Sequence, residues 1–132
     1  MATSIFVNLA VADVARSRAF FESLGWRANE QFSDEQSVCI EIGDTVFAML
    51  HATERFSGYS HKTIADASTT IETILAVTVE SRADVDDVTD RALRSGGSSA
   101  RQPEDHGFMY ARSFHDLDGH LWEVLWMAPE ID

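Results

Sequence analysis

The chain has 132 residues, which is the length of one domain and enough to bury a hydrophobic core without disulfides or metals. Its 22 acidic and 10 basic residues give a formal net charge of −12, and no cluster of Lys and Arg interrupts the acidic excess. Because nucleic acids and anionic membranes are bound through basic surfaces, this balance argues against both kinds of partner.

The cysteine and hydropathy patterns predict a cytoplasmic protein. The single cysteine, Cys39, excludes an internal disulfide framework and lies in an apolar stretch typical of a core strand. No basic region followed by a long apolar run opens the sequence, and no apolar stretch approaches the about 20 residues of a membrane-spanning helix.

Residues 4–51 predict a βαβββ module. Alternating apolar residues indicate a strand over 4–11, and a helix follows that Asp13 caps and Gly25 ends. Three further strands are expected, the last two joined as a hairpin by the turn at 43–44. They cover residues 26–31, 37–42 and 45–51.

A polar segment with no clear period connects this module to the next, over residues 52–70. It is longer than most loops inside a compact domain, and such loops tend to be functional or disordered. We expect it to act as a lid or as an arm in a dimer.

Residues 73–127 repeat the plan. A strand over 74–80 leads to a helix, at whose start Ser81 and Asp84 resemble a capping box, and the glycines at 96–97 end it. Three strands complete this second βαβββ module, over residues 97–102, 108–114 and 120–127.

The repeat indicates a tandem duplication. Matching the two helix caps superposes Phe6 on Ile74, and matching the two final strands superposes Ala48 on Glu123. We therefore predict one α+β domain over residues 1–132, in which the tandem modules form a curved, barrel-like mixed sheet around a cleft with helices outside. The four matched residues are expected to face the cleft.

Glu123 is the one acidic residue in an apolar final strand. Strand alternation separates it from Trp122 and Trp126, which are predicted to pack under the helices. An ionised carboxylate is costly to bury without a partner. The position therefore requires a metal, a cation, a hydrogen-bond donor or an open cavity.

Other polar residues are expected on the same cleft-facing surface. Asn8 shares the face of Phe6, where it either binds a ligand or satisfies a neighbouring backbone group. Thr78 shares the face of Ile74 and adds a hydroxyl. Arg112 is expected to lie on the face opposite Ser113. On that face, a salt bridge from Arg112 to an acidic residue of the helix is one possibility. Four histidines in or beside expected loops are predicted to be solvated: His51, His61, His106 and His115.

Two stretches carry a resemblance to a known family. Residues 11–25 and the closing Asp-Leu-Asp-Gly-His-Leu-Trp-Glu of 116–123, together with the doubled βαβββ plan, resemble the vicinal oxygen chelate superfamily. That superfamily holds glyoxalase I, extradiol dioxygenases, fosfomycin-resistance thiol transferases and bleomycin-resistance binding proteins. Residues 6–9 and 107–114 are most similar to bacterial proteins described as predicted lactoylglutathione lyases.

The resemblance implies four metal-ligand positions, which fall on Phe6, Ala48, Ile74 and Glu123. Only Glu123 is able to bind a cation, and divalent metals need several protein ligands, so we expect neither a metal nor another cofactor. Ser113 falls where the fosfomycin-resistance relatives carry a pocket tyrosine, and it is expected to donate a hydrogen bond.

Three functions remain open on these residues. The first is a bleomycin-resistance-type protein that binds a small molecule in a mostly apolar cleft and forms a homodimer, as relatives of this length commonly do. The second is a glyoxalase-type lyase in which burial raises the pKa of Glu123, so that it acts as general base on a hemithioacetal or similar carbon acid. In the third, Glu123 is purely structural. The expected substrate-binding residues are Asn8, Phe6, Ala48, Ile74, Thr78 and Ser113.

Overall fold

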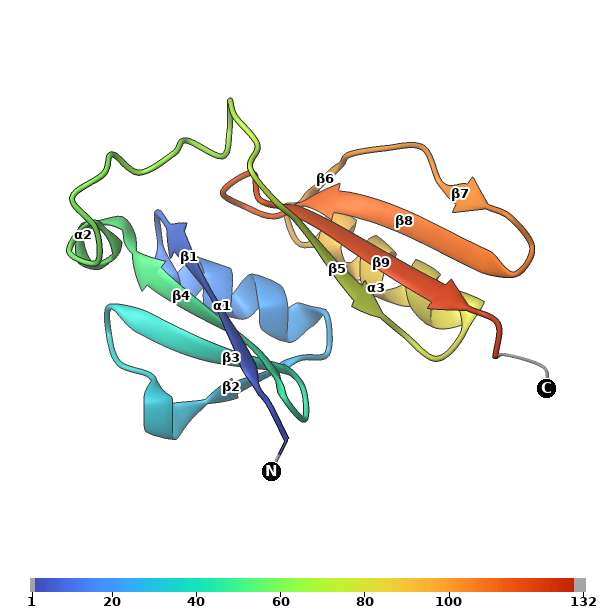
Figure 1. The fold of residues 1–132 in the computed structure, drawn as a ribbon, viewed down its shortest axis with the longest axis horizontal. Helices are drawn as coiled ribbons and strands as arrows, with labels where there is room; N and C mark the ends of the chain where they lie inside the picture. Colours follow the sequence, from blue (N-terminus) through green and yellow to red (C-terminus); the bar gives the residue numbers. More distant parts are fainter. Residues whose placement is uncertain (1, 130–132) are drawn as a thin grey trace. The chain divides into compact units, whose positions relative to one another are not determined.

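A computed structural model describes residues 2–129, which form two compact units that divide between Ala65 and Asp66. Each unit holds one mixed sheet and one long helix, so the α+β prediction is confirmed (Figure 1). Unit 1 contains β1 (Ile5–Val11), α1 (Val14–Ser23), β2 (Arg27–Asn29), the 3-10 helix η1 (Glu30–Phe32), β3 (Ser37–Gly43), β4 (Val46–Ala52) and α2 (Thr53–Ser57). Unit 2 contains β5 (Ile74–Thr78), α3 (Arg82–Arg94), β6 (Ser98–Ser99), β7 (Glu104–Asp105), β8 (Met109–His115) and β9 (Leu121–Met127).

The two sheets have the same plan. In unit 1 the strand order is β1-β4-β3-β2, and in unit 2 it is β5-β9-β8-β6, with β7 also paired to β8. In each, the first strand pairs in parallel with the last and the other pairs are antiparallel. Among the described residues neither sheet closes into a barrel. The repeat seen in the sequence is therefore a repeat of sheet topology.

Both long helices begin and end at the residues that the sequence predicts. The side chains of Asp13 and Ser81 each accept a hydrogen bond from the backbone N–H three residues on, at 3.0 Å. Gly25 and Gly96 follow the helices with φ of 98° and 108°, in the left-handed region that glycine adopts without strain. Within residues 2–129, no helix has the length and apolar character needed to cross a bilayer.

Each long helix covers one face of its own sheet (Figure 1). Alternation along the strands supplies apolar residues to this face, which forms the core with the helix stripe. In unit 1 the core includes Leu9, Val11, Phe20, Phe21, Ile40 and Leu50, and in unit 2 it includes Val85, Ala92, Phe114, Trp122 and Val124. The opposite face of each sheet is the place to look for function.

The short elements differ from the sequence predictions. The strand expected over 26–31 stops at Asn29, because the Asn29 side chain accepts a hydrogen bond from the Gln31 backbone N–H and begins η1. The strand expected over 97–102 is reduced to the two residues of β6. A second two-residue strand, β7, follows it and pairs with β8.

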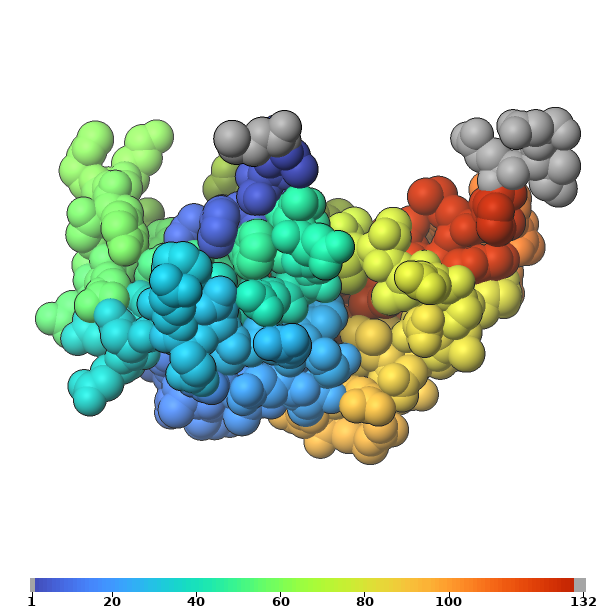
Figure 2. All heavy atoms as spheres, turned by 90° about the horizontal axis from the view of Figure 1, so that it is seen from below, coloured from blue at the N-terminus to red at the C-terminus, as the bar shows by residue number. Residues whose placement is uncertain are grey.

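The segment 52–70 is not wholly irregular. It begins with α2, which lies directly after β4 and contacts both β4 and β1. In the space-filling view the light-green residues after β4 stand out from the rest of unit 1 (Figure 2). The structure thus ties the first part of this segment to one sheet.

A buried carboxylate holds the turn between β8 and β9. One oxygen of Asp116 accepts hydrogen bonds from the backbone N–H groups of Asp118 and His120, and the other accepts from the Trp122 indole, each at 3.0 Å. Burial raises the pKa of the Asp116 carboxyl above its ordinary value, although His120 and the hydrogen bonds act in the opposite direction. The turn therefore depends on one side chain.

We expect Asp116→Ala to lower the free energy of unfolding by about 2–4 kcal/mol, because it leaves buried donors without a partner. Chemical denaturation measures the change. The matched control is Asp44→Ala in the exposed β3–β4 turn, expected to change stability by about 0.5 kcal/mol or less. Equal losses in the two variants would show that Asp116 does not hold its turn.

Candidate functional site on the open sheet face of unit 2

Four of the predicted site residues share one face of the sheet in unit 2. Ser113 lies directly opposite Glu123 in the β8–β9 ladder. Ile74 pairs with the residue two before Glu123, and Thr78 pairs with the residue two after it, so both point the same way. We call this surface, opposite α3 and carrying Ile74, Thr78, Ser113 and Glu123, the Glu123 face.

Glu123 has a cation as its partner. A terminal nitrogen of Arg101 lies 3.8 Å from a Glu123 carboxylate oxygen, and the Glu123 side chain is 25 % exposed. Arg101 also forms an ion pair with Glu104, and its backbone N–H donates to the Ser113 hydroxyl at 3.0 Å. The sequence left four possible partners or surroundings for this carboxylate, and the structure places a cationic side chain, that of Arg101, beside it.

Apolar side chains share the sheet face of this ion pair. Ile74 is 53 % exposed and Met127 is 55 % exposed, and both lie on the Glu123 face. Leu121 and Leu125, which alternate with the core residues of β9, are half-buried on the same face. The Glu123 face therefore combines apolar side chains with the ion pair of Glu123 and Arg101, the exposed hydroxyl of Thr78 and the buried hydroxyl of Ser113.

The prediction for Ala48 is wrong. Ala48 pairs with Val7 and is 1 % exposed, in the core beneath α1. Phe6 pairs instead with Phe47, and the two rings stack with centroids 4.6 Å apart. Ala48 and Phe6 therefore lie on opposite faces of the sheet.

The ladder shows which residue corresponds to Glu123 in unit 1. Glu123 stands two residues beyond the partner of Ile74, and the residue two beyond the partner of Phe6 is Met49. The match made in the sequence was one residue off because the β3–β4 hairpin contains an irregularity between residues 41 and 43 and a shorter turn than β8–β9.

Asn8 lies on the open face of the unit 1 sheet, as expected, and its amide is engaged within the protein. Its nitrogen donates to the Phe6 carbonyl at 3.1 Å, and its oxygen lies 2.7 Å from the Nε2 atom of His51. His51 is 3 % exposed, so the prediction that it is solvated is wrong. Its position at the end of β4 places its ring on the sheet and not in a loop.

The opposite face of unit 2 is structural. Arg112 donates to Asp86 and Asp90 of α3, at 2.9 Å in both cases, and Tyr110 donates to Asp86 at 2.7 Å. This confirms the salt bridge between Arg112 and a helix acid. Trp122 is buried on this face, as predicted. These groups fasten α3 to β8 and β9.

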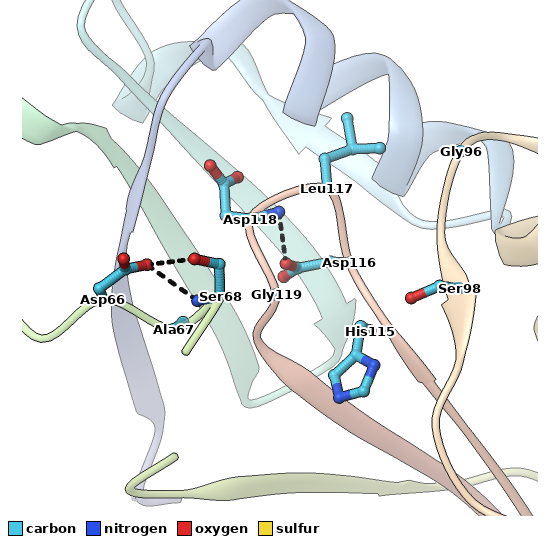
Figure 3. Close-up of a pocket in the computed structure, with 10 residues that line it drawn as sticks. All are labelled: Asp66, Ala67, Ser68, Gly96, Ser98, His115, Asp116, Leu117, Asp118 and Gly119. Atoms are coloured by element: carbon cyan, nitrogen blue, oxygen red, sulfur yellow. Dashed lines mark hydrogen bonds between the residues drawn. The ribbon is translucent and has the colours of Figure 1, made fainter. Parts of the chain in front are cut away.

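A hollow lies at the β8–β9 turn of unit 2, with a volume of about 580 Å³ (Figure 3). Its walls are the turn itself, Ser98, and the loop 66–68, where the Asp66 carboxylate accepts from the Ser68 hydroxyl and backbone N–H. The polar groups drawn there with dashed lines bond to each other (Figure 3). We therefore regard this hollow as a product of turn geometry.

Comparison with known proteins places the chain in a family. The sequence profile described as the glyoxalase/bleomycin resistance protein/dioxygenase superfamily matches residues 5–124. The chain belongs to this superfamily. No curated protein sequence gives a significant match.

Solved structures of the superfamily fold are similar over nearly the whole chain. A hypothetical protein, SA1046, from S. aureus has 26 % identity, covers 96 % of this chain and 94 % of its own, and has a TM-score of 0.80. A superfamily enzyme from Burkholderia phytofirmans PsJN has 16 % identity, coverage of 96 % and 99 %, and a TM-score of 0.77. The fosfomycin resistance protein FosX from Mesorhizobium loti has 17 % identity, coverage of 98 % and 93 %, and a TM-score of 0.68.

The residues present do not fit the metal that the superfamily implies. With the corrected register, the four ligand positions hold Phe6, Met49, Ile74 and Glu123, which supply one carboxylate, one thioether and two hydrocarbons. Hard divalent cations require several oxygen or imidazole ligands. The Arg101 guanidinium beside Glu123 also repels a second cation. In the part of the chain that the structure describes, no three His, Cys, Asp or Glu side chains gather as a metal site.

We expect Gly119→Ala to be more destabilising than Gly107→Ala. Both glycines have positive φ, so each substitution costs about 1 kcal/mol of backbone strain. A Cβ at Gly119 would also lie 2.6 Å from the Ala67 carbonyl oxygen, whereas nothing lies within 4 Å at Gly107. The clash adds about 1–3 kcal/mol, measured as the difference in unfolding free energy between the variants. Equal values would mean that the loop 66–68 does not rest on the turn.

Proposed function

We propose that the protein binds a small organic molecule on the Glu123 face, without a divalent metal held at the four ligand positions that the superfamily implies. The observation that carries the proposal is the exposure of Ile74 and Met127 beside the ion pair of Glu123 and Arg101. Binding sites for small molecules are mostly apolar and contain a few polar groups that orient the ligand. Exposed apolar patches on a sheet face commonly mark such sites.

The glyoxalase-type alternative receives less support. A general base must direct a free carboxylate oxygen at the proton that it removes. The Glu123 carboxylate instead faces the Arg101 guanidinium, which also pairs with Glu104. The backbone N–H of Arg101 donates to the Ser113 hydroxyl, which fixes the position of this residue.

Binding is tested by titrating the isotope-labelled protein with small aromatic and aliphatic carboxylates and amines, each followed by NMR. We expect a ligand to shift the methyl signals of Ile74 and Met127. Ile74→Asp is expected to raise the Kd of the ligand at least about tenfold, because it places a charge in the apolar contact. The control is Ile71→Asp, which changes another exposed isoleucine just before β5 and should leave Kd unchanged. Equal weakening by both variants, or shifts confined to the other face, would refute the proposal.

The same protein distinguishes a binder from an enzyme. Elemental analysis is expected to find no stoichiometric divalent metal, and isomerisation of a hemithioacetal is expected to be undetectable. A measurable rate that Glu123→Gln abolishes would support the enzyme and overturn the binder.

We also propose that the protein forms a homodimer. Two-fold symmetric dimers are the commonest assemblies of soluble proteins, and exposed side chains that are not part of the Glu123 face, such as Ile5 and Phe6, provide apolar area for an interface. Light scattering coupled to size-exclusion chromatography is expected to give twice the mass of one chain. A single-chain mass at all concentrations would contradict it.

A further inference from the structure

A continuous chain of hydrogen bonds crosses the open face of the sheet in unit 1. The Ser37 hydroxyl lies 2.7 Å from Nδ1 of His51, and Nε2 of His51 lies 2.7 Å from the Asn8 amide oxygen. Arg55 from α2 donates to the Ser37 hydroxyl at 3.2 Å and to the Asp34 carboxylate at 2.9 and 3.1 Å. Three strands, one turn and one helix thus meet in one polar network.

The donors in this network have one consistent direction. A guanidinium only donates, so the Ser37 oxygen accepts from Arg55 and its own proton is free to go to His51. The Asn8 nitrogen donates to the Phe6 carbonyl, so the Asn8 oxygen is the acceptor for His51. A neutral imidazole with its proton on Nε2 and a lone pair on Nδ1 satisfies both of these contacts.

The segment 53–59 covers this imidazole. The ring of Tyr59 lies 5.1 Å from the His51 ring and that of Phe56 lies 6.2 Å from it, measured between centroids. His51 and Ser37 are consequently buried, while Tyr59 itself is 66 % exposed. The cover is one residue thick at this point.

The charged groups that face His51 oppose a second proton on the ring. Burial lowers the pKa of His51 below its ordinary value, the positive charge of Arg55 lowers it further, and the negative charge of Asp34 acts in the opposite direction. Among the described residues, Tyr59 is a further titratable group whose ring lies against His51, and the neighbouring Ser37, Asn8 and Phe56 carry no charge.

We propose that His51 is a pH-sensitive latch, which in its neutral form holds residues 53–59 against the sheet of unit 1 and in its protonated form releases them. A proton on Nδ1 would remove the acceptor of the Ser37 hydroxyl and leave that hydroxyl's own proton without its partner. It would also bury a positive charge beside Arg55. Both penalties disappear when α2 and Tyr59 lift and water reaches the ring. The latch lies in unit 1 and is independent of ligand binding on the Glu123 face.

Amide hydrogen exchange across a pH series tests this latch. The amides to follow are those of Gly58 and Tyr59, which bond to the carbonyls of Arg55 and Phe56 at 3.0 Å. Below the ordinary histidine pKa of 6.5, their opening constant, corrected for the intrinsic exchange rate, should rise as the pH falls toward the lowered pKa of the closed state, by at most about tenfold for each pH unit. The amides of β4 should not show this rise. Protection of 58 and 59 that stays constant from pH 7.5 to 5 would overturn the latch.

Two variants separate His51 from other acid effects. His51→Gln carries no titratable proton, so the opening constant should no longer depend on pH. His61→Gln alters an exposed histidine of the same unit and should keep the wild-type slope. A slope retained in His51→Gln, or lost in His61→Gln, would refute the latch.

A measurement on the wild-type protein decides the matter if His51→Gln does not fold. The nitrogen chemical shifts of the His51 imidazole report its tautomer and its protonation. We expect an unprotonated Nδ1 at pH 7.5, and protonation of the ring in step with the opening of the Gly58 and Tyr59 amides. A ring that protonates while these amides stay protected would contradict the latch.

Discussion

Each unit has one long helix for one sheet, so its own helix can bury only one of the two sheet faces. The helix-side face takes the apolar core, from Leu50 in unit 1 to Val124 in unit 2. The other face must expose its side chains or find another cover. Unit 2 leaves Ile74 exposed around an ion pair, whereas unit 1 places α2 and Tyr59 over a hydrogen-bonded histidine. The proposed binding site and the proposed latch both lie on these second faces.

The architecture was predictable because its signals are local. Alternating apolar residues mark the strands. The ends of the long helices are marked by short signals of a few neighbouring residues, at Asp13, Ser81, Gly25 and Gly96. The duplication was visible for the same reason. A repeated set of local signals gives a repeated topology, and the family resemblance agrees with the profile match over residues 5–124.

Register was less predictable, because it depends on how two strands meet across a turn. The sequence match between the two hairpins was shifted by one residue. It therefore gave Ala48, in the core, as the counterpart of Glu123, whereas the ladder gives Met49, on the open face. The match between the helix caps, which involves no hairpin, chose Ile74, and the ladder of β5 with β9 places Ile74 and Thr78 on the same face as Glu123.

The partners of the polar groups were not predictable from local pattern. Arg101 reaches Glu123 from an irregular segment 22 residues earlier, and Arg55 reaches Ser37 from a helix that the polar composition of residues 52–70 conceals. Such contacts depend on side-chain reach across strands. No spacing in a single sequence reports them, and this is why His51 was expected in solvent.

The carboxylate of Asp116 gives a structural reason for the stretch of this chain that most resembles the family. Residues 116–122 carry much of the family resemblance, and the structure uses their acid to hold a turn and an indole in place. This function in folding is needed whether or not a metal or a reaction is retained nearby. A search that weights this stretch will therefore gather proteins by shared architecture, and will retain members whose reactive groups have been replaced.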